Sequence, residues 1–399
     1  MAKDHREIGQ ELDLFSTSEK TPGFIYWHPK GALLFDLIVK DIKERLEKFD
    51  YQEIKTPAII ATSILKESGH YDNYHEKLFF VGSEKELKEP KWALKPMNCP
   101  GSIMIFKSKM RSYKELPLRF SEIGTVYRYE QAGEVGGLFR VRALTIDDAH
   151  IYCREEQIEE EIISLINFVN ETYQKYGFEN IHIELSTRPE KSIGTDEQWQ
   201  KAEDGLKKAL ETKNLEYKLN EGEGAFYGPK IDFHVKDSQG RSWQMGTIQL
   251  DFSMSERLEA FYIDEKNHKQ NPVIIHRAIL GSIERFMGVL LEHTGGNLPT
   301  WMVPVQAQVI PISEKYIDYA KEIADKVQNS GIRVAVDLSN ESVSKKIREA
   351  EIQKIPYMLV IGEKEKAAGK VSIRTHKENN LGMKSLEEVV ELIKQEPKN

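Results

Sequence analysis

The segments LRFSEIGTVYRYE, residues 118–130, and FRVRALTIDDAHIYC, residues 139–153, carry the clearest strand pattern in the chain. Apolar and polar residues alternate in both segments, and a glycine-containing stretch lies between them. Alternation bounded by glycines predicts two strands that are joined by a long loop. The same two segments also hold the densest group of side chains that could do chemistry.

Arginine is prominent among these side chains. Arg128 and Glu130 are two residues apart, which places them on one face of the first predicted strand, and Arg140 and Arg142 share a face of the second. Arg285 lies at the start of a later predicted helix, in GSIER. A guanidinium group binds pairs of phosphate oxygens, so a converging set of arginines predicts a phosphate site. For each arginine taken alone, a solvated surface position is the alternative.

The composition is that of a globular protein, with 399 residues, 40% hydrophobic residues, 30% charged residues and a net charge of −8. This length suits two or three domains. Two cysteines exclude a disulfide framework and fit a reducing compartment. We find no apolar signal core at the N-terminus and no apolar run near the roughly 18 residues that span a bilayer, so we expect a cytoplasmic protein without a membrane segment. The negative charge argues against nucleic-acid binding by overall field but allows a local basic groove.

Helical periodicity is strongest in residues 31–49, 155–177 and 197–212. Gly177 is expected to end the second of these helices. Further strands are expected at 181–186, 231–236 and 242–253, and residues 276–293 are expected to begin as a strand and continue as a helix.

The pattern changes after PTWMVPVQ. The short apolar segments AQVIPI, RVAVDL, YMLVIG and KVSIRTH follow, with helical stretches near 314–329, 342–353 and 385–395 among them. Strands that alternate with helices predict a separate α/β domain with a mixed sheet, which begins near Val303.

Several motifs together resemble the class II aminoacyl-tRNA synthetases, and among them the threonyl-tRNA synthetase family. EIKTPAI resembles the first motif of the class, LRFSEIGTVYRYE with FRVRALTIDDAH the second, and HRAILGSIERF the third. The segments WHPKG, SGHYDNY, KPMNCPG, LSTRPEKSIGTDE and EGAFYGPKIDF are also similar to this family. The resemblance runs from about residue 4 to residue 395.

The resemblance implies an α+β fold, in which an antiparallel sheet flanked by helices is followed by a small α/β anticodon-binding domain with a mixed sheet. The implied domains are a catalytic domain at 1–302, with a linker helix and lead-in at 1–30, and an anticodon-binding domain at 303–399. Pro57 matches an interface motif, which implies a homodimer. The family commonly carries N-terminal domains that include an editing domain, and we expect this chain to lack them; whether that short form is natural is left open by the sequence.

Cys99, in KPMNCPG, is the first candidate metal ligand. A lone cysteine is ordinarily a small buried hydrophobe. The resemblance instead implies that Cys99, His150 and His276 bind one zinc ion, and one thiolate with two imidazoles leaves an open position on Zn²⁺. By resemblance, that position takes the amino and hydroxyl groups of threonine. Cys153 is the local rival, but strand alternation puts it on the face opposite His150, so we expect a core residue.

The resemblance also assigns side chains to both substrates. Arg128 matches the arginine that holds the α-phosphate and the threonine carboxylate, and His70 matches a histidine near the 3′ end of the tRNA. The implied catalytic residues are Arg128, Lys230, Arg285 and His70. ATP, with Mg²⁺, is assigned to Arg128, Glu130, Arg140, Gln244 and Arg285, and threonine to Met97, Asp148, Tyr227 and Gln249.

Contacts with the tRNA anticodon are implied for Asn340, Glu365 and Arg374, for which a solvated rim is the alternative. Two positions depart from the family pattern. Leu144 stands where the family usually has an aromatic residue that stacks on adenine, and Ile146 stands where it usually has a glutamine. We therefore expect the change at Leu144 to remove the stacking on adenine and the change at Ile146 to remove part of the polar network of the pocket.

The implied function is that of a threonine–tRNA ligase, which activates threonine with ATP and transfers it to the 3′ end of threonine tRNA. Two alternatives stay open. The chain could be a non-catalytic tRNA-binding relative of this class, or a related class II ligase for serine or proline. The presence of Arg128, Glu130, Lys230, Arg285 and the Cys/His/His set favours the active ligase over the non-catalytic relative. The Cys/His/His set also argues against a ligase for serine or proline.

Overall fold

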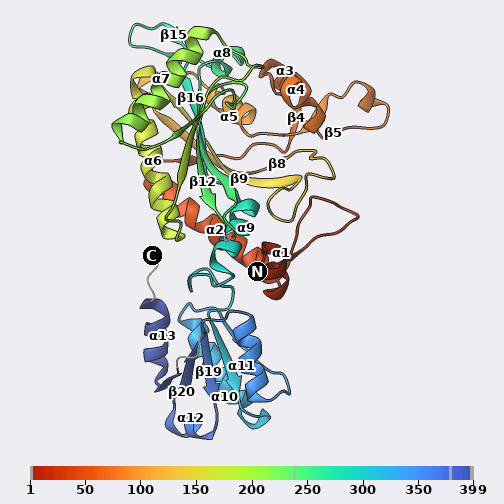
Figure 1. Ribbon diagram of the computed structural model, residues 1–399, viewed down its shortest axis with the longest axis vertical. Coiled ribbons are helices and arrows are strands. Elements are labelled where there is room, and N and C mark those ends of the chain that lie inside the picture. The colour runs from red at the N-terminus through yellow and green to blue at the C-terminus, as the bar shows by residue number, and fades with distance from the viewer. Residues whose placement is uncertain (1–2, 238, 377–379, 396–399) are drawn as a thin grey trace. The chain divides into compact units, whose positions relative to one another are not determined.

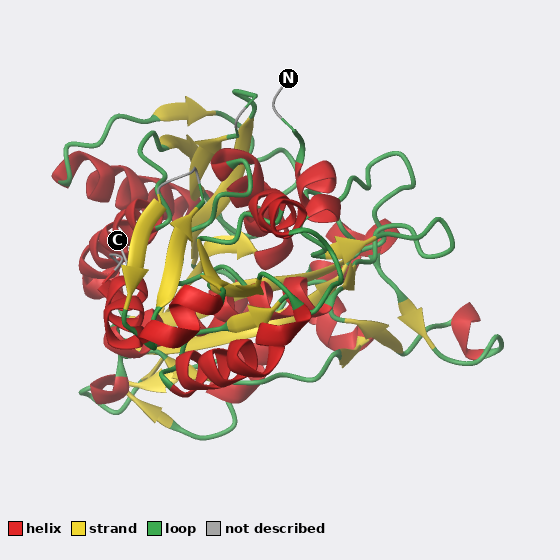
Figure 2. Ribbon diagram, turned by 90° about the horizontal axis from the view of Figure 1, so that it is seen from below, coloured by secondary structure: helices red, strands yellow, loops and turns green. Residues whose placement is uncertain are grey.

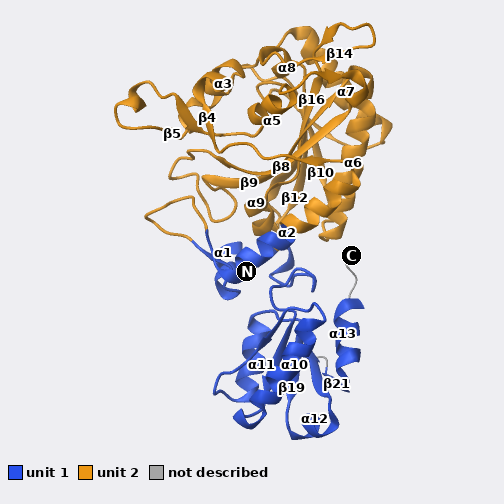
Figure 3. Cartoon of the chain, turned by 180° about the vertical axis from the view of Figure 1, so that it is seen from behind, with its two compact units in different colours: residues 1–16, 26–38, 291–399 blue, residues 17–25, 39–290 orange. Residues whose placement is uncertain are grey.

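The computed structural model describes residues 3–237, 239–376 and 380–395. The chain divides into two compact units, which Figure 3 colours separately. Unit 1 contains residues 1–16, 26–38 and 291–399, and unit 2 contains residues 17–25 and 39–290. In the described part of the chain, no helix is both long and apolar enough to cross a membrane.

An eight-stranded sheet forms the centre of unit 2 (Figure 1). Its edge pairs β10–β11 and β3–β8 are parallel, and every pair from β10 through β8 is antiparallel. The predicted α+β class with an antiparallel sheet is therefore confirmed. The strand order is β11 (Lys218–Asn220), β10 (His182–Ser186), β12 (Lys230–Lys236), β13 (Ser242–Asp251), β16 (Val273–Ser282), β9 (Ala143–Cys153), β8 (Leu118–Tyr127) and β3 (Gln52–Glu53).

Helices α6 (Ile158–Lys175) and α7 (Asp196–Thr212) lie side by side against this sheet, where α6 contacts β13 and β16. Leu165 and Phe168 of α6 are buried, as the apolar stripe of an amphipathic helix requires. Thr195 caps the start of α7, and Gly177, with φ of +80°, follows the end of α6. Both predicted helices are confirmed, as is the third, which is α2 (Pro29–Lys48).

The central strand pair differs from its prediction at both ends of the loop. β8 ends at Tyr127 and β9 begins at Ala143, so the arginines lie outside the strands. Arg142 is buried, whereas the Arg140 side chain is 48% exposed, so these two arginines do not share one environment. The loop backbone is responsible, because Gly136 N donates to Arg140 O before the ladder begins.

Unit 2 also contains short elements that the sequence did not predict, and Figure 2 colours the helices and strands of the chain. Two three-stranded sheets are present, one in the order β4 (Ile59–Ala61), β6 (Trp92–Leu94) and β5 (Phe80–Val81), the other in the order β15 (Lys269–Gln270), β14 (Tyr262–Ile263) and β7 (Arg111–Ser112). Four short helices were also not predicted: α3 (Thr62–Glu67), α4 (His70–Tyr74), α5 (Cys99–Phe106) and α8 (Met254–Arg257). The strand-to-helix prediction for residues 276–293 is confirmed by β16 and α9 (Ile283–Thr294), and the last residues of α9 belong to unit 1.

Unit 1 contains the predicted mixed sheet, in the order β18 (Val334–Val336), β17 (Ala307–Pro311), β19 (Tyr357–Ile361), β20 (Val371–Thr375) and β21 (Asn380–Lys384). Its helices are α1 (His5–Glu11), α10 (Ile317–Asn329), α11 (Val343–Ile352), α12 (Glu363–Ala368) and α13 (Leu386–Gln395), and a two-stranded ribbon joins β1 (Phe15–Ser16) to β2 (Tyr26–Trp27). Val309, Leu359 and Ile373 lie in its core. Residues 1–16 and 26–38 belong to this unit, so compactness divides the chain differently from the boundary near Val303, which stays a prediction.

Candidate functional site

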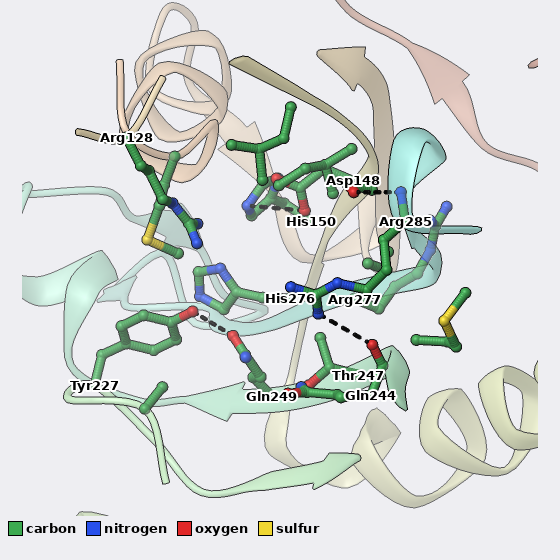
Figure 4. A pocket seen from close by; sticks show the side chains of 18 of the residues that line it. Arg128, Asp148, His150, Tyr227, Gln244, Thr247, Gln249, His276, Arg277 and Arg285 are labelled. Carbon is green, nitrogen blue, oxygen red and sulfur yellow. Dashed lines mark hydrogen bonds and ion pairs between the residues drawn. The ribbon is translucent and has the colours of Figure 1, made fainter. Parts of the chain in front are cut away.

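A cavity of about 270 Å³ opens over one face of the central sheet in unit 2 (Figure 4). Strand β9 supplies alternate residues to it, at positions 144, 146, 148 and 150, because residues two apart on a strand share a face, and β13 and β16 supply further lining residues. Nine predicted site residues line it: Met97, Arg128, Asp148, His150, Tyr227, Gln244, Gln249, His276 and Arg285. Segments that are far apart in the sequence therefore meet at one site.

Cys99, His150 and His276 form one group at this cavity, and their candidate ligand atoms all lie within 4.8 Å of one another. His150 and His276 are directly paired across β9 and β16, and Cys99 is the first residue of α5. All three are buried. The shared location of three soft and borderline ligands is what a zinc site with an open position requires.

The polar atoms of this group support a metal at its centre. Among the described residues, His150 Nε2 and His276 Nδ1 are buried and have no hydrogen-bond partner. Asp251 Oδ2 lies 3.2 Å from the other ring nitrogen of His276. A histidine that is fixed by a carboxylate on one nitrogen and left unpaired on the other is prepared to bind a metal. The residues present therefore fit zinc.

Burial also shapes the protonation of this group. It raises the pKa of the Cys99 thiol well above its usual value, and Asp148 and Asp251 raise it further. It lowers the pKa of His150 well below its usual value, and the charge of His276 adds to this effect. A neutral imidazole is the form that binds metals, whereas the thiol must lose its proton when a metal binds.

His70 lies beside this group instead of lining the cavity. Its side chain is fully buried, with Nε2 3.2 Å from Cys99 Sγ and Nδ1 2.9 Å from Ser68 Oγ. Burial lowers the pKa of His70 to about 3. His70 is therefore not a surface imidazole, and its role at the tRNA 3′ end stays a prediction.

Next to the metal group, the cavity wall is polar. The Tyr227 hydroxyl donates to Gln249 Oε1, and Asn98 Nδ2 donates to Asp148 Oδ2 at 3.1 Å. Burial raises the pKa of Asp148 to about 6. These groups offer a hydroxyl, an amide and a carboxylate to a small polar ligand. Asn98 was not predicted as a site residue, although it precedes Cys99 in the sequence.

Arg128 and Arg285, the two predicted phosphate-binding arginines of this cavity, are each held by backbone carbonyls, and Arg128 Nε donates to Pro96 O at 3.1 Å. Arg285 Nε donates to Phe139 O at 3.0 Å and Nη1 to Gln244 O at 3.2 Å, which fixes the direction of the guanidinium. Burial lowers the pKa of Arg285, and the positive charges of Arg140 and Arg128 lower it further. Cations that are placed close enough to repel one another are suited to share an anion.

The remaining predicted nucleotide residues hold other partners at their polar ends. Lys230 Nζ lies 2.6 Å from Asp232 Oδ2, and Gln244 Nε2 donates to Asp232 Oδ1. Glu130 is paired with Lys77 at 3.1 Å. Lys230, Glu130 and Arg140 are not among the described residues that line the cavity, whereas Leu144 and Ile146 are.

The predicted anticodon residues all lie in unit 1. Glu365 accepts from Gly362 N at 3.0 Å and from Ser372 Oγ at 2.6 Å, so its carboxylate already caps α12. Asn340 is exposed. Arg374 lies on β20, and its Nε is buried without a hydrogen-bond partner among the described residues.

Comparison with known proteins places these features in context. The tRNA synthetase class II core domain family (G, H, P, S and T) matches residues 81–294, and the anticodon binding domain family matches residues 306–396. A threonine–tRNA ligase of Clostridium botulinum is 49% identical over 397 residues, and one of Caldanaerobacter subterraneus is 50% identical over 394 residues. These alignments cover 100% and 99% of this chain but 62% and 60% of the relatives, so the chain spans less than two thirds of their length.

One solved structure is similar along the whole chain. The crystal structure described as the RNA binding domain of threonyl-tRNA synthetase from Cryptosporidium parvum Iowa II is 41% identical, with a TM-score of 0.94. The match covers 100% of this chain and 99% of that one.

Proposed function

The chain belongs to the class II aminoacyl-tRNA synthetases, and within them to the threonyl-tRNA synthetase family, and from this premise we propose that it is a threonine–tRNA ligase. One observation carries the proposal. His150 and His276 of the buried Cys/His/His group line the same cavity as Arg128 and Arg285, so an amino acid and a nucleotide can be held within reach of each other.

We propose that Cys99, His150 and His276 hold one zinc ion. Zinc, when bound by these three residues, would supply Lewis-acid coordination to the amino and hydroxyl groups of threonine. Tyr227, Gln249 and Asp148 would then surround the substrate with polar groups. Replacement of Cys99 by Ala should abolish zinc retention in elemental analysis of the purified protein, and full zinc content in that variant would refute the assignment.

In the first step, a carboxylate oxygen of threonine forms a bond to the α-phosphorus of ATP, and the bond from that phosphorus to the bridging oxygen of pyrophosphate breaks. Arg128 would orient the carboxylate and the α-phosphate, and Arg285 would bind the outer phosphates together with Mg²⁺. Catalysis then depends on positioning and on neutralisation of charge. In the second step, a ribose hydroxyl at the 3′ end of the tRNA attacks the acyl carbon, and AMP leaves.

We also propose a cytoplasmic homodimer that recognises the tRNA anticodon through residues 306–396. The apolar side chains of Ile59 and Trp92 support the dimer, because they are 46% and 51% exposed on paired strands next to Pro57. The two free cysteines suit a reducing compartment. Sedimentation of a monomer at micromolar concentration would refute the dimer.

The test of the activity is ATP–pyrophosphate exchange with threonine, serine and proline in parallel. A threonine–tRNA ligase gives the highest rate with threonine. A higher rate with serine or proline would instead identify the related ligases. A chain that binds tRNA but exchanges pyrophosphate with none of them would be the non-catalytic relative.

A further inference from the structure

Asp147 is a fully buried carboxylate that lies next to the site without lining the cavity. Its Oδ1 accepts hydrogen bonds from the backbone N–H groups of three consecutive residues, Ile279, Leu280 and Gly281, each at 3.1 Å. Its Oδ2 lies 3.0 Å from Ile279 N and 3.6 Å from Arg277 Nη1. A carboxylate that collects several backbone donors in this way makes strong, charge-assisted bonds.

These three residues form a bulge in the sheet. Ala278 is paired with Asp148 and Ser282 with Ile146, so residues 279–281 on β16 face only Asp147 on β9. Their N–H groups therefore have no strand partner there, and buried donors must be satisfied by some other acceptor. The Asp147 carboxylate is that acceptor.

Residues of α6 and β13 hold the bulge as well. The Tyr173 hydroxyl donates to Ile279 O at 2.7 Å. Gly281 has φ of +72°, and a Cβ at this position would lie 2.4 Å from Met245 O, so a side chain fits neither the backbone nor the space. The course of the chain through residues 279–281 is thus fixed on both sides.

The bulge determines how α9 enters the cavity. Gly281 of the bulge lines the cavity, as do Ser282 and Arg285, which follow the bulge in the chain. Ser282 Oγ accepts from Arg285 N at 3.1 Å, which begins the helix that carries the arginine. A displaced bulge would therefore move Arg285 relative to Arg128, although neither side chain touches Asp147.

We propose that Asp147 is a positioning residue for the nucleotide: it shapes the bulge that places Arg285 at the phosphates. This inference rests on the proposed function, because it takes ATP to bind at the arginines. It follows that loss of one of the two Asp147 acceptor oxygens should weaken ATP binding more than it weakens threonine binding.

The test is the replacement Asp147→Asn, which keeps the size of the side chain but leaves one oxygen for the three donors and places an amide near Arg277. We expect the KM for ATP in pyrophosphate exchange to rise about 10- to 100-fold, as for other supporting residues. The KM for threonine and the zinc content should stay near the wild-type values. A purely structural role would instead reduce the active fraction, and so kcat, without raising the KM for ATP.

Tyr173→Phe is the second variant, because it loosens the same bulge from α6 and removes a single hydroxyl. It should raise the KM for ATP by about 3- to 10-fold, the effect of one neutral hydrogen bond. The matched control is Glu161→Gln, which removes a buried carboxylate that binds Arg119 Nε at 2.8 Å and lies on α6 about three turns before Tyr173. It should lower stability without a change in the KM for ATP.

The inference is wrong if folded Asp147→Asn has a KM for ATP within twofold of the wild-type value. If Asp147→Asn does not fold, an unchanged KM for ATP in Tyr173→Phe would equally overturn the inference. Calorimetric titration with ATP separates this result from a failure of the proposed function. A wild-type chain that exchanges no pyrophosphate would refute the ligase, whereas the ratio of ATP dissociation constants between variant and wild type would still decide the role of Asp147.

Discussion

The replacement Asp251→Asn tests how much the contact between Asp251 and the proposed metal ligand His276 contributes to zinc affinity. Asp251 is fully buried, and its two oxygens have separate partners. Oδ1 accepts from Ser253 N at 2.7 Å and from Met254 N at 3.0 Å, whereas Oδ2 lies 3.2 Å from His276 Nε2. An asparagine that keeps its oxygen at the first position retains both backbone bonds. Only the contact with His276 then changes.

The change alters which nitrogen of His276 carries a proton. With the carboxylate present, Nε2 donates to Asp251, and Nδ1 keeps a lone pair for the metal. With an amide in its place, an N–H group faces Nε2, which favours the ring form that carries its proton on Nδ1. Loss of a supporting carboxylate of this kind typically lowers metal affinity about 10- to 100-fold, or about 1.4–2.8 kcal/mol.

The assay is competition for zinc between the protein and a chromophoric chelator, at fixed pH. Asp237→Asn is the matched control, because Asp237 is also buried and divides its bonds in the same way. Its Oδ1 accepts from two backbone N–H groups, and its Oδ2 accepts from Arg241 Nε and Trp243 Nε1. The control should lose stability and keep its zinc affinity. Wild-type zinc affinity in Asp251→Asn would refute the reasoning.

Three further predictions concern stability, selectivity and tRNA recognition. Burial raises the pKa of Glu284 from 4.5 to about 7, so the folded state holds the proton more tightly than the unfolded state. The free energy of unfolding therefore falls as the pH rises from 4.5 to 7, by at most about 3 kcal/mol from this group. Urea unfolding of Glu284→Gln should show a correspondingly flatter pH dependence. Serine should be activated with a kcat/KM about 10- to 200-fold below that of threonine, because it lacks one methyl group. Valine should be rejected more strongly, because it has no hydroxyl group for the polar site; equal rates for serine and valine in pyrophosphate exchange would contradict this. Arg374→Ala should weaken aminoacylation of tRNA but leave threonine-dependent exchange intact, and equal losses in both assays would exclude a role limited to the anticodon.

The sequence predicted the long elements well because their periodicity is strong. The strands on either side of the arginine loop, and helices α2, α6 and α7, bury one face along their whole length, and this leaves a regular pattern. Short strands such as β4 and β6 have two or three residues of no distinctive pattern, and their pairing is decided by the surrounding chain.

The composition of the metal group could not be derived from local spacing. Cys99 begins a helix and His150 and His276 lie on neighbouring strands, so no short motif holds the three residues together. Resemblance to a family supplied the group, and the geometry brings its members together. The burial of His70 against Cys99 was missed for the same reason, because the contact joins segments 29 residues apart.

Asp251 and Asp147 show where a pattern could have helped and where it could not. Strand alternation in QLD places Asp251 on the same face as Gln249, so a carboxylate beside the substrate wall was within reach of sequence reasoning. In IDDAH the same rule puts Asp148 with His150 at the cavity and sends Asp147 to the opposite face. From strand alternation alone, Asp147 would be a buried carboxylate, and burial of a carboxylate without hydrogen bonds is costly in free energy. The role of Asp147 follows only from its pairing with β16, because the three N–H groups that it binds belong to residues more than 130 positions later. These residues form the bulge at which the pairing of β16 with β9 changes register. One of two adjacent carboxylates thus faces the cavity, and the other holds the backbone that leads into the helix carrying Arg285.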